Sequence, residues 1–166
     1  MAIRHRVHRY ETTVRWHGST GAGYAAYSRA HAATATPAEA ELALTADPAF
    51  RGDPRLLSPE QLVVIAASSC QLLSFLAIAA RAGVDVLDYE DAAEGTMPED
   101  DEPVRITSIV LRPRIVVGAG ADPARIASFC QQAHHECYVA NSLRTEVRVE
   151  PEIVVREAHD VGTVRS

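Results

Sequence analysis

The chain has 166 residues, of which 47% are hydrophobic and 23% charged, and its net charge is −6 at pH 7. This length suffices for one soluble domain with a sizeable core. The basic start (Arg4 to Arg9) is short and has no matching stripe later, so we expect no nucleic-acid partner. No apolar signal segment follows it, and with three cysteines this indicates a reducing, cytoplasmic setting rather than a disulfide framework.

The first third of the chain predicts β-structure. Residues 10–17 are rich in β-forming side chains, and residues 24–34 form a second such run. The glycine-rich segment 18–23 between them is interpreted as a hairpin turn, because no helical pattern follows it. Residues 39–44 predict a short third strand, and a loop over 47–57 leads onward.

The stretch from Gln61 to Ala80 contains no charged residue and predicts one long apolar helix. Ser58, Pro59 and Glu60 supply an N-cap, a proline at the first helical position and a first-turn acid, and Gly83 lies just beyond the end. A helix that is apolar on all sides must be enclosed on all sides. Its length of ~20 residues would also cross a bilayer. Its central serine and glutamine residues favour a buried helix, and we expect no membrane contact.

After this helix, strands and helices do not alternate in the regular pattern that builds parallel sheets, so the sequence predicts an antiparallel α+β sheet. One sheet covers only one side of an apolar helix, and we therefore expect an obligate homodimer. A single domain is expected over 1–156, with a disordered tail over 157–166. The remaining expected segments are a strand 86–97, a strand 104–117, a helix 123–135, a short helix from Cys137 and a last strand 145–156.

Two sequence motifs carry the functional information. Residues 58–70 read SPEQLVVIAASSC, and residues 134–143 read HHECYVANSL. Together with YSRAH at 27–31 and the strand order, they resemble the OsmC/Ohr family of thiol-dependent peroxidases over about residues 10–156. In that family a Pro-Glu-Glu/Gln-Leu helix start leads to a cysteine ten residues after the Glu, and a second cysteine opens a later short helix. The resemblance implies an OsmC-like α+β fold, with antiparallel sheets wrapped around long central helices in an intertwined homodimer.

The resemblance also implies roles for four residues. Cys70 would be the peroxidatic thiol, Cys137 the resolving thiol, and Glu60 and Arg29 would orient and activate the site. The substrate would be an organic hydroperoxide and the reductant a dithiol, of which a lipoyl group is one example, with no cofactor and no metal. The arginine is assigned by spacing from four candidates, which are Arg15, Arg29, Arg51 and Arg55.

Elementary chemistry agrees with these residue types. Burial in an apolar helix disfavours the thiolate that must attack the peroxide, so a nearby cation is needed, and arginine remains charged when it is desolvated. The carboxylate of Glu60 would hold that arginine. Glu60 and Cys70 are ten residues apart, roughly 15 Å along a helix. If Glu60 belongs to the site, either it serves the Cys70 of a partner chain or the helix start bends, and in both cases we expect the site at the dimer interface.

Two other function classes stay open at this point. Cys130, His134 and Cys137 fall at i, i+4 and i+7, which would place two thiols and an imidazole on one helix face, with Cys70 as a further ligand. Such a set suits zinc. The other alternative is a binding module for apolar ligands that has lost turnover. In the peroxidase interpretation Cys130 is only a packing residue.

Overall fold

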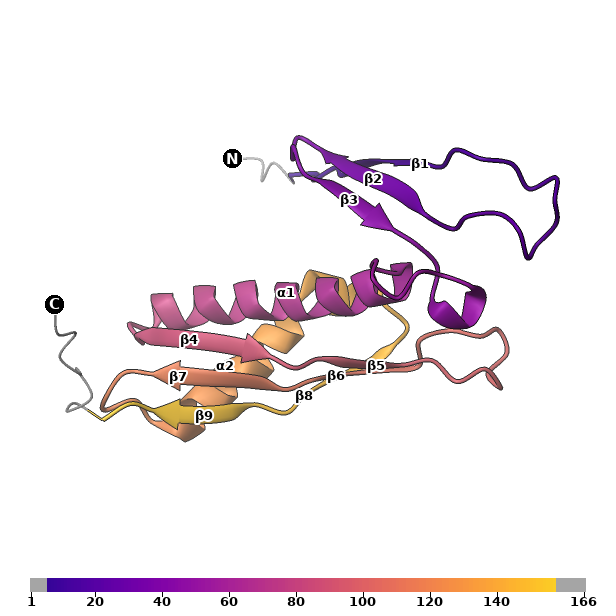
Figure 1. Cartoon of the computed structure of the whole chain (residues 1–166). Coiled ribbons are helices and arrows are strands. Elements are labelled where there is room, and N and C mark those ends of the chain that lie inside the picture. Colours follow the sequence, from indigo (N-terminus) through magenta and orange to yellow (C-terminus); the bar gives the residue numbers. More distant parts are fainter. Residues whose placement is uncertain (1–5, 158–166) are drawn as a thin grey trace, which may run out of the picture. The chain divides into compact units, whose positions relative to one another are not determined.

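The computed structural model describes residues 6–157. These residues form two compact units, an N-terminal unit up to Leu62 and a C-terminal unit from Val63. The N-terminal unit is an antiparallel three-stranded sheet in the order β1–β2–β3 (Figure 1). The predicted first and third strands are confirmed, but the second begins at residue 31 rather than 24, because turns occupy the preceding segment and Gly23 has a positive φ of 90°. The elements of the N-terminal unit are β1 (Glu11–Arg15), β2 (His31–Thr36), β3 (Glu41–Leu44) and the short 3-10 helix η1 (Pro48–Phe50).

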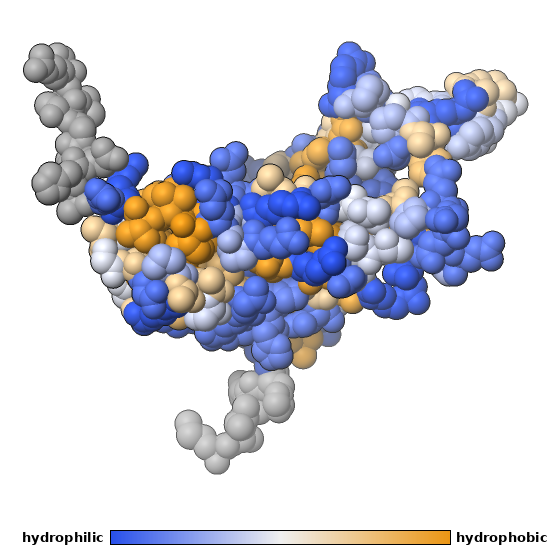
Figure 2. Space-filling model, turned by 90° about the horizontal axis from the view of Figure 1, so that it is seen from below, coloured by the Kyte–Doolittle hydropathy of each residue, from blue (hydrophilic) through white to orange (hydrophobic). Residues whose placement is uncertain are grey.

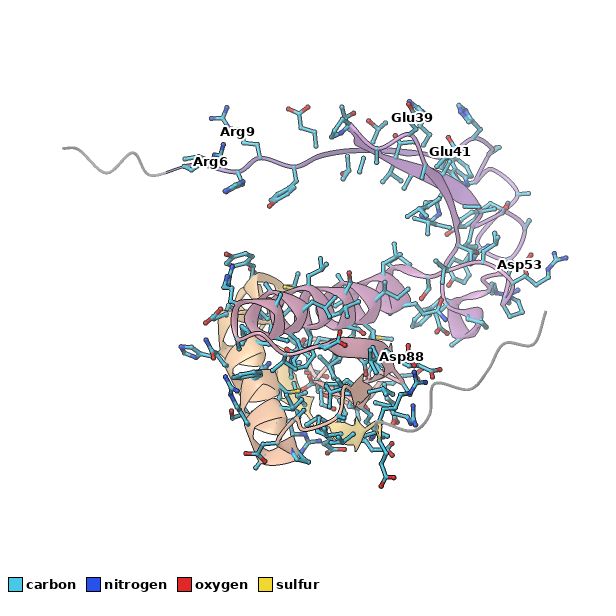
Figure 3. The ribbon with its side chains drawn as sticks, turned by 90° about the vertical axis from the view of Figure 1, so that its left-hand side faces the viewer. Arg6, Arg9, Glu39, Glu41, Asp53 and Asp88 are labelled. Atoms are coloured by element: carbon cyan, nitrogen blue, oxygen red, sulfur yellow. The ribbon has the colours of Figure 1, made fainter. Side chains whose placement is uncertain are left out.

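This sheet has one apolar and one polar face. Val14 lies opposite Ala33, which in turn lies opposite Leu42, so these three side chains share one face across all three strands. Thr13, opposite Thr34 and Glu41, belongs to the other face. Both Glu39 and Glu41 project from the β2–β3 hairpin in Figure 3. On the apolar face, Val14 is 64% exposed and Leu42 is 43% exposed.

The C-terminal unit combines helices with a three-stranded layer. Strands β4, β7 and β9 form one sheet, and β5, β6 and β8 form another that continues it strand by strand (Figure 1). Helix α1 (Pro59–Arg81) starts in the last residues of the N-terminal unit and confirms the predicted central helix. The other elements are β4 (Val86–Asp91), β5 (Glu94–Thr96), β6 (Ser108–Leu111), β7 (Pro113–Val117), α2 (Pro123–Glu136), α3 (Tyr138–Ser142), β8 (Glu146–Val149) and β9 (Glu152–Val155).

Each of the three long strands expected in this unit is in fact two short ones. The segment 86–97 is β4 and β5, 104–117 contains β6 and β7, and 145–156 is β8 and β9. In the last case Pro151 lies in the gap between the two strands, where its missing N–H removes a donor from the ladder.

The expectation of a wholly antiparallel sheet is wrong for this unit. β8 pairs with β6 and β9 pairs with β7, both in parallel. The physical reason is the connection: α2 and α3 lie between β7 and β8, and such a helical crossover returns the chain in the same direction. The antiparallel pairs are β4 with β7 and β5 with β6.

Both helices pack against the central strands. The larger core cluster joins Phe75 and Ala79 of α1, Ile115 of β7, and Ile126 and Cys130 of α2, all of them fully buried. A second cluster joins Ala67 of α1 to β6, through residues 109 and 111. The inner face of α1 therefore packs against strands β6 and β7 and helix α2.

The opposite face of α1 is not covered by the described elements of the C-terminal unit. Leu73 is 64% exposed and Ile65 is 48% exposed, although we expected the helix to be enclosed on every side. By length and composition alone, α1 could cross a membrane, a test that core helices of soluble proteins also pass. Most of the surface seen in Figure 2 is hydrophilic, with hydrophobic side chains gathered in patches. We call the uncovered face the exposed α1 stripe; it consists of Ile65, Ala66, Ser69, Leu73, Leu76 and Ala80.

The expected tail over 157–166 lies outside the described residues except for its first position.

Candidate active site

Two of the predicted site residues, Cys70 and Cys137, are neighbours in the C-terminal unit. Cys70 lies in the middle of α1 and is partly exposed, whereas Cys137 is 1% exposed. Burial raises the pKa of the Cys137 thiol to about 11, and a hydrogen bond to the Cys70 thiol adds to the increase. Both thiols are free. Two neighbouring free thiols can form a disulfide where their Cα atoms come within about 7 Å.

The backbone around Cys137 fixes its sulfur. Cys137 has an extended conformation between α2 and α3 and is the N-cap of α3. Its Sγ accepts a hydrogen bond from the amide of Ala140 at 3.4 Å, and its own amide donates to the carbonyl of His134 at 3.2 Å. Helix α2 ends at Glu136, one residue beyond the predicted end at 135, and the expected short helix follows as α3 with Cys137 as its N-cap.

A groove of about 460 Å³ opens beside the thiol pair. It follows α1 from Ala66 to Arg81, and the other wall is the junction of α2 and α3. Its charged groups are Arg81 and Glu136, both exposed. The groove is thus an elongated, mainly apolar channel with a thiol partway along it. Its remaining lining residues are Ser69, Cys70, Leu73, Ser74, Ala77, Tyr138 and Val139.

Cys130 is a packing residue, as expected. Its side chain is fully buried in the larger core cluster, and burial raises its pKa to about 12. Its carbonyl accepts a hydrogen bond from Nε2 of the buried Gln71 at 2.9 Å. At neutral pH this thiol is protonated and shielded, which makes it a poor nucleophile and a poor metal ligand.

The metal-site alternative has no geometric support. Among residues 6–157, no group of three or more His, Cys, Asp or Glu side chains is arranged to hold a metal ion. The end of α2 at Glu136 removes the continuous helix face that Cys130, His134 and Cys137 would have required.

The other two predicted site residues, Arg29 and Glu60, belong to the N-terminal unit. The guanidinium of Arg29 lies over the ring of Tyr27, 3.8 Å from the centroid, and 4.6 Å from that of Tyr24. It also donates to the carbonyls of both tyrosines. Arg29 lines a mainly apolar pocket of about 460 Å³ together with Trp16 and His31. Arg29 forms no ion pair with any described residue. The carboxylate partner that we expected for it is therefore not found among residues 6–157.

Glu60 lies in the first turn of α1 but does not cap it. The cap is a reciprocal pair, in which the amide of Ser58 donates to Gln61 Oε1 at 2.9 Å and the amide of Gln61 donates to Ser58 Oγ at 3.4 Å. One carboxylate oxygen of Glu60 is buried without a hydrogen-bond partner among residues 6–157. Because α1 is one helix, Glu60 and Cys70 are roughly 15 Å apart along its axis, as the spacing predicted.

Sequence reasoning missed three contributors to these surroundings. Tyr24 and Tyr27 contact the guanidinium of Arg29 with their rings. In the sequence, the only indication of these contacts is that the tyrosines lie five and two residues before the arginine. Gln71 was treated as one of several polar residues of the helix, yet it is fully buried and ties α1 to α2. A single glutamine on an otherwise apolar helix face, next to a candidate thiol, was the available signal.

Comparison with known proteins agrees with this architecture. An OsmC-like protein from Vibrio cholerae, described as of unknown function, has 28% identity and a TM-score of 0.79, covering 87% of this chain and 99% of its own. An organic hydroperoxide resistance protein from Legionella pneumophila has 18% identity and a TM-score of 0.61, with coverages of 87% and 97%.

The organic hydroperoxide resistance protein OhrB of Bacillus subtilis has 17% identity and a TM-score of 0.58, with coverages of 88% and 98%. At 18% and 17% identity, the similarity to the Legionella pneumophila and Bacillus subtilis proteins shows only that the fold is shared. A search of curated proteins found no match. The family described as OsmC-like protein matches residues 52–152, which include the central helix and both thiols of the pair. With more than half of its residues matched, this chain belongs to the OsmC-like family.

Proposed function

We propose that this protein is a cysteine-based peroxidase that reduces organic hydroperoxides, with Cys70 as the peroxidatic and Cys137 as the resolving thiol. The observation that carries the proposal is that the free thiols of Cys70 and Cys137 are neighbours beside a mainly apolar groove. Family membership and the hydroperoxide resistance of structural relatives point the same way. Oxidative-stress defence is the expected setting.

The proposed cycle has three steps. The Cys70 thiolate attacks the terminal oxygen of ROOH, the O–O bond breaks, and the alkoxide takes a proton and leaves as the alcohol. Cys70 is then a sulfenic acid. The sulfur of Cys137 attacks the Cys70 sulfur, the S–O bond breaks, and the departing hydroxide leaves as water with the Cys137 proton. An external dithiol reduces the resulting Cys70–Cys137 disulfide by exchange.

The groove supports the choice of substrate class. Leu73, Ala77 and Val139 present apolar surface near Cys70, which an alkyl or aryl group can cover. Hydrogen peroxide has no such group and gains nothing from that surface. At about 25 cal/mol per Å² of buried apolar area, even a small hydrocarbon group favours the organic hydroperoxide strongly.

Arg29 and Glu60 enter the proposal as groups that activate and orient the site. Within the described residues, Arg29 has no carboxylate partner and one buried carboxylate oxygen of Glu60 has no hydrogen-bond partner. Both side chains can therefore form a further polar contact. We propose that a second copy of the chain supplies the partners of these polar contacts. In this arrangement a guanidinium from the N-terminal unit of one copy stabilises the thiolate of the other.

The central test is a comparison of peroxides. Reduced protein is expected to consume cumene or tert-butyl hydroperoxide at least about tenfold faster than hydrogen peroxide, because about 1.4 kcal/mol of extra binding suffices for that factor. Single-turnover kinetics with residual-peroxide measurement gives both rates. Protein alkylated with iodoacetamide is the control and should be inactive. Binding of a hydroperoxide without its consumption would favour the binding-module alternative and contradict the proposal.

A homodimer is the second testable element of the proposal. Exposed apolar side chains lie on the exposed α1 stripe and on the apolar face of the N-terminal sheet, and we propose that two copies of the chain cover each other's faces. Leu73→Glu would place a charge in the centre of the stripe, so we expect this variant to sediment as a monomer at micromolar concentration, where the parent sediments as a dimer.

Leu87→Glu is the matched control, because Leu87 is an exposed leucine on β4 rather than on α1, and this variant should remain dimeric. A parent protein that sediments as a stable monomer would contradict the dimer and the shared site together.

A further inference from the structure

We propose that Asp91 is a positioning residue for the thiol pair: through a hydrogen bond from Ser68 it fixes the rotation of α1 about its axis and thereby keeps Cys70 beside Cys137. Asp91 and Ser68 act on the thiol through the backbone of the helix. The inference rests on the proposed function in one respect, since it takes Cys70 and Cys137 as the pair that forms the disulfide.

Asp91, the last residue of β4, joins α1 to the sheet with its two carboxylate oxygens. Oδ2 accepts a hydrogen bond from Ser68 Oγ at 2.5 Å, and Oδ1 accepts one from the backbone amide of Arg112 at 2.7 Å. Arg112 is the single residue between β6 and β7, and its guanidinium pairs with Glu94 at 3.1 Å and with Glu150 at 3.3 Å. The carboxylate of Asp91 is thus held by the sheet through one oxygen and bound to the helix through the other.

Ser68 and Cys70 lie on opposite flanks of α1, because two residues correspond to roughly 200° around a helix of 3.6 residues per turn. The flank with Ser68 faces β4, where the ring of Phe75 lies 5.8 Å from that of Tyr89. The flank with Cys70 faces the junction of α2 and α3, since Cys70 lines the groove together with Val139. A rotation of α1 that moves Ser68 relative to β4 therefore also moves Cys70 relative to this junction.

Two polar ties hold α1 at the height of Cys70. Ala67 belongs to one core cluster and Phe75 to the other, and the thiol lies between these two positions. Apolar contact is non-directional, whereas a hydrogen bond has a preferred length and angle. One polar tie is the bond to β4, and the other runs from Gln71 Nε2 to the carbonyl of Cys130 at 2.9 Å. A helix tied at one point can pivot about that point, so the tie to β4 is needed for a single rotation.

The rotation of α1 matters because a disulfide has strict geometric requirements. Its two Cα atoms must lie within about 7 Å of each other, with the side chains directed toward one another. Where the reduced protein already holds the helix in the required rotation, little freedom is lost when the bond forms. Where α1 samples several rotations, the bond must select one of them, and the equilibrium constant for its formation falls.

The test measures the redox equilibrium of the thiol pair without peroxide. Protein is equilibrated in graded mixtures of dihydrolipoate and lipoate; as the Cys70–Cys137 bond forms, two electrons and two protons pass from the thiols to the lipoate disulfide. After alkylation with iodoacetamide, mass spectrometry gives the linked fraction. A hydrogen bond to a charged group corresponds to about a factor of ten in an equilibrium constant. In Ser68→Ala the equilibrium constant for the disulfide should therefore fall about tenfold, which raises its midpoint potential by about 30 mV.

Further variants separate this bond from general loosening. Ser68→Thr keeps the hydroxyl and should retain the parent's potential. The double variant of Ser68→Ala with Asp91→Ala should show no rise beyond that of Asp91→Ala alone, because both substitutions remove the same bond. Ser128→Ala is the matched control: it removes a hydroxyl of α2 that donates locally to the carbonyl of Arg125 at 2.7 Å. Arg112→Ala keeps the amide that Asp91 accepts and removes only the ion pairs, so both controls should match the parent.

The inference is overturned by an unchanged or lowered potential in Ser68→Ala, or by a rise as large in either control. A parent protein that forms no Cys70–Cys137 disulfide in any mixture would also overturn it. An unchanged potential in Ser68→Ala leaves the peroxidase proposal standing. The expected rise in a protein that consumes no hydroperoxide would remove the peroxidase proposal and leave the role of Asp91 intact.

Discussion

Cys70→Ser is expected to lose hydroperoxide reduction by a factor on the order of 10³ or more. A serine hydroxyl stays protonated at neutral pH, and oxygen cannot follow sulfur through a sulfenic acid to a disulfide. The fold should persist, because Cys70 is only partly buried and lies outside both core clusters. Single-turnover consumption of cumene hydroperoxide by the reduced variant measures the loss, and circular dichroism checks the fold.

Cys130→Ser is the matched control for this result. The substitution removes a thiol from the same unit, but one that is fully buried in the core and protonated at neutral pH. We expect full peroxide consumption, together with a loss of about 1–3 kcal/mol in the free energy of unfolding because a hydroxyl replaces a buried thiol. Equal loss of activity in both variants would mean that Cys130 takes part in the chemistry and that Cys70 is wrongly assigned.

Cys137→Ser should separate the two halves of the cycle. The variant should consume about one equivalent of hydroperoxide and then stop, since the Cys70 sulfenic acid has no internal thiol to condense with. At higher peroxide it should over-oxidise to the sulfinic acid. Multiple-turnover assays with a dithiol, combined with intact mass measurement, detect the added oxygen atoms. Continued turnover at the parent's rate would show that Cys137 is not the resolving thiol.

The disulfide itself is open to direct mapping. Peroxide-treated parent protein should yield a linked Cys70–Cys137 peptide pair, because these two free thiols are neighbours in the reduced protein. Cys130 should remain unlinked, with its side chain enclosed in the core. A linkage through Cys130, or none at all, would contradict the assignment.

The sequence by itself determined the family and much of the local structure. The motif around Ser58 and the uncharged run after it define α1 with both its ends, and the second motif places Cys137 at the start of a short helix. These features are local, since caps, prolines and apolar runs act over a few residues, which is why they could be predicted. The roles assigned to Cys70, Cys137, Glu60 and Arg29 remain predictions, although the structure brings the two thiols together.

The tertiary structure decided the rest. The parallel pairing of β6 with β8 depends on a crossover through α2 and α3, and no local pattern encodes which distant strand a segment will join. The tyrosine contacts of Arg29 and the burial of Gln71 between two helices are likewise long-range results of packing. The sequence could name Cys137 as a reactive residue, but only packing determines that its sulfur accepts a hydrogen bond from the amide of Ala140 and neighbours Cys70.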